Sequence, residues 1–235
     1  MKPRIVHDWP RRMSECAKIQ KELLLPLLDL YGSVPDEGLV LGIEAVTLEP
    51  ARKIYCAATL MRYPGFTEVE RNLSEDDIPF PFSLELNSFR EGRVIVKTLE
   101  KIQARPDLIM VHGDGINNPS GVGLACHLGI IYEIPAIGCF RRLRGAERPK
   151  VGRAKGAQAK IVSDGREVAV ALRSKEETKP IFVSPGYKIS LDEAVAKTLS
   201  MLRGFRTPEP IRVPHLLATR QRSSQKRMYR TQERE

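Results

Sequence analysis

The chain has 235 residues, of which 42% are hydrophobic and 29% charged, a composition typical of one large soluble domain or two small ones. No run approaches the roughly 18 apolar residues of a membrane helix, and the N-terminus lacks the apolar core of a secretion signal. We therefore expect a cytoplasmic protein with no membrane partner. Cys16, Cys56, Cys126 and Cys139 are widely separated, without a CxxC pair, which favours reduced, buried thiols over a zinc site or disulfides.

The net charge of +9 is concentrated in two segments. Residues 141–155 contain seven basic residues and one acid, and residues 220–235 contain six basic residues and two acids. Localised positive charge favours a polyanionic partner such as DNA or RNA. The alternative is a solvated loop and a solvated tail.

The first half of the chain predicts a helix followed by an antiparallel meander. Residues 14–30 have the apolar spacing of an amphipathic helix, with Ser14 as a candidate N-cap and Pro26 as a kink or end. Apolar runs then predict three strands joined by short connections: residues 39–48, 54–62 and 66–70. The acidic residues 72–80 are expected to form a loop.

Two glutamates in this half are candidate site residues. Glu44 lies inside an apolar strand, where a carboxylate is costly to bury unless a cation or donor meets it; the alternative is an edge position that reaches solvent. Helical spacing over residues 88–103, with Ser88 as cap, places Glu91 in the first turn. A carboxylate is also favourable there for purely structural reasons.

Residues 106–129 organise the second half. A buried strand, residues 108–111, runs directly into a glycine-punctuated turn that carries four polar side chains: His112, Asp114, Asn117 and Asn118. Polar groups at the carboxyl end of a strand are typical of α/β sites. An apolar helical pattern then follows through Leu124 and Ile131.

The remaining elements complete a mixed α/β sheet. We expect a strand at 134–140, a hairpin at 160–174 with Asp164-Gly165 at its turn, and a strand at 180–186. Ser190 and Glu193 predict a capping box for a helix over 190–202. Strands first, then alternating strands and helices, indicate one mixed sheet with helices on its faces. The expected organisation is an arm (1–13), a domain (14–215) and a flexible basic tail that could order on a partner (216–235).

Several segments resemble the endonuclease V family in order and spacing from about residue 14 to 215. They include LGIEA, NSFREG, PDLIMVHGDGINNPSGVGLACHLG, PIFVSPGYKISLDEA and FRTPEPIRVPH. The resemblance implies a single-domain ribonuclease H-like fold. It also implies a Mg²⁺- or Mn²⁺-dependent endonuclease that hydrolyses a phosphodiester near deaminated adenine (inosine) in DNA or RNA.

The resemblance also implies the catalytic residues, with changes from the family pattern. Glu44 stands for the first-strand aspartate, His112 for the aspartate that opens the turn, and Arg141 for a lysine, whereas Glu91 and His215 are unchanged. Asp114 follows two residues after the changed position. The expected metal ligands are Glu44, Glu91 and either His112 or Asp114. Imidazole is a poor Mg²⁺ ligand, so His112 would favour Mn²⁺.

Substrate contacts follow from the same resemblance. The family wedge P-Y-I-P-G is PFSLE here, residues 81–85, and Asn118 replaces a histidine. The expected substrate-binding residues are Pro81, Phe82, Gly113, Gly115, Asn118, Gly138, Phe182 and Arg212.

The changed residues leave a second hypothesis open, a nucleic-acid-binding relative that has lost cleavage and needs no metal. A third hypothesis, a nucleotide-phosphate cradle built by the turn glycines, matches neither known glycine-rich fingerprint. We expect a monomer.

Overall fold

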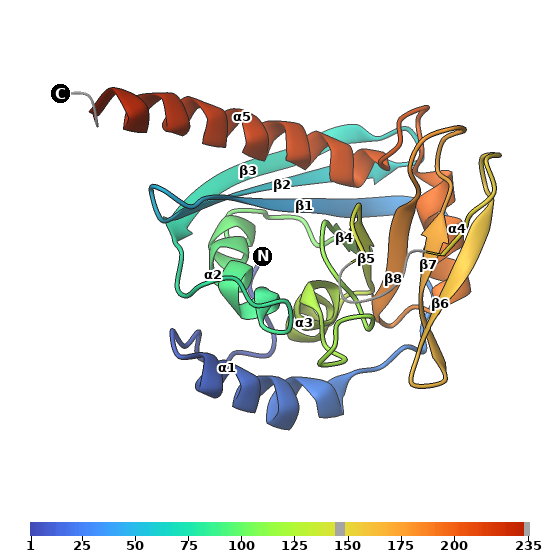
Figure 1. Ribbon diagram of the computed structural model, residues 1–235, viewed down its shortest axis with the longest axis horizontal. Helices are drawn as coiled ribbons and strands as arrows, with labels where there is room; N and C mark the ends of the chain where they lie inside the picture. Colours follow the sequence, from blue (N-terminus) through green and yellow to red (C-terminus); the bar gives the residue numbers. More distant parts are fainter. Residues whose placement is uncertain (144–148, 233–235) are drawn as a thin grey trace.

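The computed structural model describes residues 1–143 and 149–232. Residues 144–148, within the basic segment 141–155, lie outside that description. The strands form one eight-stranded mixed sheet in the order β3-β2-β1-β4-β5-β8-β7-β6 (Figure 1). Their bounds are β1 (Gly38–Leu48), β2 (Lys53–Tyr63), β3 (Thr67–Asp77), β4 (Leu108–Val111), β5 (Ala136–Phe140), β6 (Gln158–Ser163), β7 (Arg166–Leu172) and β8 (Ile181–Tyr187).

Helices cover both faces of the sheet, as predicted for a single α/β domain. In chain order they are α1 (Met13–Ile19), continued by a π turn (Gln20–Leu24) and a 3₁₀ turn (Leu25–Leu27), then α2 (Asn87–Leu99), α3 (Leu124–Tyr132), α4 (Leu191–Ser200) and α5 (Glu209–Gln232). The helices α2 and α3 pack on one face, and α5 lies on the other, along β1 and β2 (Figure 1). Within the described residues, no helix is long and apolar enough to cross a bilayer.

The alternation of β1 explains which side chains reach which face. Leu41 and Ile43 belong to the core beneath α2 and α3, whereas Val40 packs with Ile211 of α5 on the opposite face. Since successive side chains of a strand alternate, Glu44 points to the same face as Val40. The alternation of side chains along β1 thus places Glu44 on the face that α5 covers.

The first three strands form the predicted meander, but the third is longer than expected. Residues 72–80 were predicted as a loop, which is wrong for most of that stretch because β3 continues to Asp77 and pairs with β2 along its length. An edge strand with an exposed face tolerates charged residues, and Asp77 meets Lys53 across the pair at 2.9 Å. The acidic composition therefore reflects exposure and not the end of the strand.

The C-terminal segment also differs from its prediction. The boundary expected at residue 216 falls inside α5, which continues to Gln232. Ala218 is fully buried and packs with Val46 and Tyr55. Apolar contacts of this kind hold the first part of the expected tail on the sheet.

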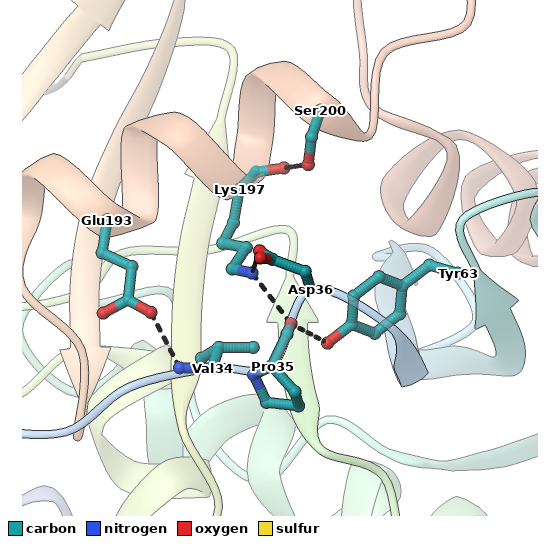
Figure 2. Close-up of polar contacts among 7 residues, drawn as sticks. All are labelled: Val34, Pro35, Asp36, Tyr63, Glu193, Lys197 and Ser200. Carbon is teal, nitrogen blue, oxygen red and sulfur yellow. Dashed lines mark hydrogen bonds and ion pairs between the residues drawn. The ribbon is translucent and has the colours of Figure 1, made fainter.

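Polar contacts fix the segment that leads into β1 (Figure 2). The Lys197 ammonium of α4 donates to the Pro35 carbonyl at 2.8 Å and contacts the Asp36 carboxylate at 2.7 Å. The Tyr63 hydroxyl donates to the same carbonyl at 2.8 Å, and the Glu193 carboxylate accepts from the Val34 amide at 2.7 Å. These contacts anchor the start of the strand that carries Glu44.

Helix caps match the sequence in part. The Ser190 hydroxyl accepts from the Glu193 amide, as a capping box requires, but the Glu193 carboxylate binds Val34 instead of reaching back to Ser190. The predicted Ser88 cap is wrong because α2 begins one residue earlier, at Asn87. All four cysteines are free and buried, which agrees with the prediction.

Candidate metal centre

Glu44 is the buried centre of the candidate site. Its side chain is 3% exposed, and β1 is an interior strand, so the alternative of a solvent-facing edge position is wrong. The His112 Nδ1 atom lies 2.8 Å from Oε1 and 2.7 Å from Oε2 of this carboxylate. The His215 Nδ1 atom lies 3.2 Å from Oε1. One carboxylate thus meets two imidazoles.

Three elements bring these side chains together. The parallel pairing of β1 with β4 ends at Ile43 and Val111, so Glu44 and His112 are the next residues on adjacent strands. His215 comes from α5, which approaches β1 closely at Gly42, where a Cβ atom would lie 1.8 Å from the Pro210 carbonyl oxygen. A side chain at position 42 would therefore push the helix, and His215 with it, away from Glu44.

The electrostatics favour an ionised Glu44. Burial raises its pKa, but the hydrogen bond from His112 and the charge interactions with His112 and His215 outweigh burial and hold the pKa below its usual value. His112 donates to Oε1, so Oε2 remains buried without a hydrogen bond, as does the Nδ1 atom of His215. Such unpartnered atoms are costly unless something else occupies them.

The donor set fits a divalent cation. Ligand atoms of Glu44, His112 and His215 lie within 4.8 Å of one another, and the two unpartnered atoms belong to this group. Two imidazoles and one carboxylate suit Mn²⁺, Fe²⁺ or Zn²⁺ better than Mg²⁺, which prefers oxygen ligands. Among the described residues, no other set of His, Cys, Asp and Glu side chains forms such a group.

Arg141 adds a positive charge beside this group. It follows directly after β5, and its Nη2 atom lies 3.5 Å from the Nε2 atom of His215. His215 is therefore held between a carboxylate and a guanidinium.

Glu91 and Asp114 lie outside the three-residue group. Glu91 is not in the first turn of α2, contrary to the expectation, since the helix begins at Asn87. Burial raises the pKa of Glu91 to about 7, and the negative charge of Glu44 adds to this effect, so the two carboxyl groups interact. The Asp114 carboxylate accepts from the Asn117 amide within the turn at 3.4 Å. Of His112 and Asp114, His112 meets Glu44.

The turn glycines and Gly138 are close-packing positions. A Cβ atom at Gly115 would lie 2.1 Å from the Pro185 carbonyl oxygen, and one at Gly138 would lie 2.5 Å from the Gly113 carbonyl oxygen. At Gly113 a Cβ atom would press on Leu124. The backbone around these glycines is filled by β5, β8 and α3, which argues against a phosphate cradle there.

Two buried amides hold the segment expected to act as a wedge. The Asn118 side chain, 4% exposed as a residue, donates to the Leu84 carbonyl at 2.9 Å. Gln20, equally buried, donates to the Glu85 and Val122 carbonyls, each at 2.9 Å. Sequence reasoning missed Gln20, although its spacing between Ala17 and Leu24 placed it on the apolar face of the first helix.

The other predicted substrate-binding residues differ in their exposure and in their contacts. Pro81 and Phe82 are exposed, and the Arg90 guanidinium lies 6.0 Å from the Phe82 ring centroid. Phe182 is 2% exposed and stacks on Phe140 at 5.4 Å, so its ring packs in the core, and its substrate contact stays a prediction. Arg212 makes two contacts with the Glu209 carboxylate, at 2.8 and 2.7 Å. Its guanidinium is thus already neutralised.

Comparisons with known proteins identify relatives of this chain. The family model for endonuclease V matches residues 30–216. Endonuclease V of Methanothrix thermoacetophila is 35% identical over 219 residues, which cover 93% of this chain and 96% of the relative.

Solved structures share the fold. The crystal structure of endonuclease V from Streptomyces avermitilis matches with a TM-score of 0.85 and 28% identity, covering 96% of this chain and 100% of that one. Ciona intestinalis endonuclease V, solved in complex with a DNA containing an inosine followed by a ribo-adenosine, matches with a TM-score of 0.78 and 21% identity over 93% of this chain and 99% of that one. The resemblance seen in the sequence motifs is confirmed, and the chain belongs to the endonuclease V family.

Proposed function

We propose that this protein is a divalent-metal-dependent endonuclease that hydrolyses a phosphodiester bond near deaminated adenine (inosine) in nucleic acid. The observation that carries the proposal is the group of Glu44, His112 and His215, which brings one buried carboxylate and two imidazoles within 4.8 Å of one another. A divalent cation held there would supply the positive charge that stabilises the transition state of phosphodiester hydrolysis.

The chain's own residues have distinct roles in this proposal. Glu44 would hold the cation and keep both imidazoles oriented, since each ring contacts its carboxylate. Arg141, beside His215, would contact a non-bridging oxygen of the scissile phosphate, because a guanidinium matches phosphate geometry. Glu91, with its pKa of about 7, would accept or release a proton near neutral pH.

Mn²⁺ is the cation we propose, in preference to Mg²⁺. The support is the contact of His112, and not Asp114, with Glu44, which makes two of three donors imidazoles. The sequence left open whether His112 or Asp114 is the third metal ligand. The Asp114 carboxylate contacts the Asn117 side chain, and this contact gives no support to Asp114 as the ligand.

Inosine is the lesion we propose. The Ciona relative was solved with DNA that contains inosine, and this chain retains an aromatic ring, 48% exposed at Phe82, in the segment that corresponds to the family wedge. Such a ring could stack on a displaced base. Asn118 and Gln20 would position it by holding the backbone of residues 84 and 85.

A second candidate function is nucleic-acid binding without cleavage. It is favoured by the separation of Glu91 and Asp114 from the three-residue group, which leaves one carboxylate where the family resemblance implies three acids.

Cleavage assays separate these functions. Purified protein is incubated with inosine-containing and undamaged DNA and RNA, in Mg²⁺ and then in Mn²⁺. We expect Mn²⁺-dependent cleavage of the inosine substrates that His112→Ala abolishes and Glu91→Ala weakens. Salt-sensitive binding without cleavage in either metal would establish the second function instead.

A further inference from the structure

We infer that one stripe of α5, formed by Thr219, Arg222 and Lys226, binds the backbone phosphates of the nucleic acid on one side of the scissile bond. This inference rests on the proposed function for the identity of the partner. It concerns residues beyond position 216, where the match to the family model ends.

The stripe continues the side of α5 that faces the candidate metal centre. Thr219, Arg222 and Lys226 follow His215 at intervals of four, three and four residues, the spacing that aligns side chains along one side of a helix. The opposite flank is occupied by core contacts, because Leu217, like Leu73 of β3, packs against the buried cluster that includes Ala218. Side chains that align with His215 therefore lie toward the site and away from β3.

Within the described chain, the half of β1 that begins at Glu44 lacks a paired strand on its β4 side. The strand pairs with β4 only from Val40 to Ile43, whereas its pairing with β2 continues to Leu48. Among the described residues, no strand pairs with the β4 side of the last five residues of β1. The helix runs along β1 and extends past the strands (Figure 1). The stripe thus runs beside a strand edge that, in this described part of the fold, is unpaired from Glu44 onward.

The chemistry of the stripe suits phosphate. No ion pair involves Arg222 or Lys226 in the described part of the chain, unlike Arg212, which Glu209 neutralises. The Thr219 hydroxyl is buried and has no hydrogen-bond partner. Residues 216–229 contain no acid. A donor hydroxyl and two unpaired cations on one line match the donors that proteins direct to a nucleic-acid backbone.

The dimensions match several nucleotides of one strand. At 1.5 Å per residue, Arg222 lies about 10 Å and Lys226 about 16 Å beyond His215 along the helix axis. One strand of a duplex covers that length with about three to five phosphates. The contacts would therefore fall on nucleotides to one side of the bond that is cut, and short flanks would not reach them.

The test compares two arginines that are two residues apart on the same helix. Arg222→Gln removes a charge from the stripe, and Arg220→Gln removes the same charge from the exposed flank that points away from it. Binding of the full chain to labelled inosine oligonucleotides is measured by fluorescence anisotropy over a range of salt concentrations. The oligonucleotides have a long flank on the 5′ side, on the 3′ side, or on both.

We expect Arg222→Gln to reduce the slope of log affinity against log salt by about 1, the value for one lost phosphate contact. The loss should occur only with oligonucleotides that carry the long flank on one particular side. Lys226→Gln should repeat the result, and Arg220→Gln should leave the slope unchanged. Circular dichroism of each variant checks that α5 remains folded.

Equal effects of Arg222→Gln and Arg220→Gln, or no effect of Arg222→Gln, would overturn the inference while leaving the proposed cleavage intact. A flank-dependent effect in a protein that never cleaves would support the stripe and refute the nuclease. Absence of binding to any oligonucleotide would refute both.

Discussion

The four histidines of this protein form two pairs that are built in opposite ways. His112 and His215 contact the carboxylate of Glu44 and are partly exposed. His7 of the N-terminal arm and His127 of α3 meet each other, Nε2 to Nε2, at 2.6 Å. Their neighbours are aromatic, since Trp9 stacks on the His127 ring at 5.0 Å.

The difference lies in the surrounding charge and not in the imidazole itself. Glu44 provides a negative charge that stabilises a cation between the first pair. Within the described residues, no ion pair joins His7 or His127 to a carboxylate, and burial lowers the pKa of both. We therefore assign metal binding to the first pair and the docking of the N-terminal arm to the second.

The largest effect is expected from Glu44→Gln. The amide cannot supply the negative charge, so several kcal/mol of transition-state stabilisation should disappear, which corresponds to at least about a thousandfold loss of cleavage. The measurement is single-turnover cleavage of an inosine oligonucleotide in Mn²⁺. His127→Phe is the matched control from the other pair, and it should retain cleavage within about twofold. Comparable losses in both variants would remove the distinction between the pairs.

For the free energy of unfolding, we expect the larger effect from the second pair, His7 and His127, and the smaller effect from the first. His127→Ala should lower the free energy of unfolding by about 3 kcal/mol, because it leaves a cavity beneath Trp9 and Phe89. His215→Ala, at a partly exposed position that leaves the hydrogen bond from His112 to Glu44 in place, should cost less than about 1 kcal/mol. Urea unfolding of the metal-free proteins measures both. A larger cost at His215 would contradict the assignment of the second pair to structure.

Mn²⁺ should stabilise the native protein by binding to His112 and His215 together with Glu44. A concentration of Mn²⁺ about one hundred times its Kd should add about 2.7 kcal/mol to the free energy of unfolding, and the same concentration of Mg²⁺ should add less. His112→Asp replaces an imidazole by an oxygen ligand, so the order of the two metals should reverse. Thermal shift assays with each metal test this. An unchanged order would show that His112 is not a ligand.

The smallest effect concerns pH. The folded pKa values of His7 and His127 lie below the unfolded value of about 6.5, so the unfolded chain binds more protons once the pH falls below that value. Stability from this pair is therefore present above pH 6.5 and is lost progressively on acidification. The double variant His7→Phe, His127→Phe should show a shallower loss between pH 7.5 and 5.5. Parallel curves would exclude the pair as the source.

Periodicity predicted most of the fold. The meander, the hairpin, the strand before the glycine turn and the capped helix at Ser190 each leave a local pattern, and all are present. The extent of β3 was missed because its charged edge gives no apolar signal, and α5 was missed because its stability comes from contacts such as that of Ala218 with β1 and β2.

The candidate site could be predicted only in part. The buried Glu44 and the turn at His112 were visible in the sequence, since each places a polar group at the end or centre of an apolar strand. Their contact was not, because it depends on where β1 and β4 cease to pair. Nor could the sequence separate Glu91 and Asp114 from the group, or show that Phe182 is part of the core.

The most direct measurement is a crystal structure of the protein grown with Mn²⁺, with anomalous diffraction recorded at a wavelength where manganese scatters strongly. We predict one anomalous peak coordinated by Glu44, His112 and His215, and no peak between His7 and His127. A peak held by Asp114 and Glu91 without His112, or no peak between the three side chains at saturating Mn²⁺, would contradict the assignment of this group as the metal centre.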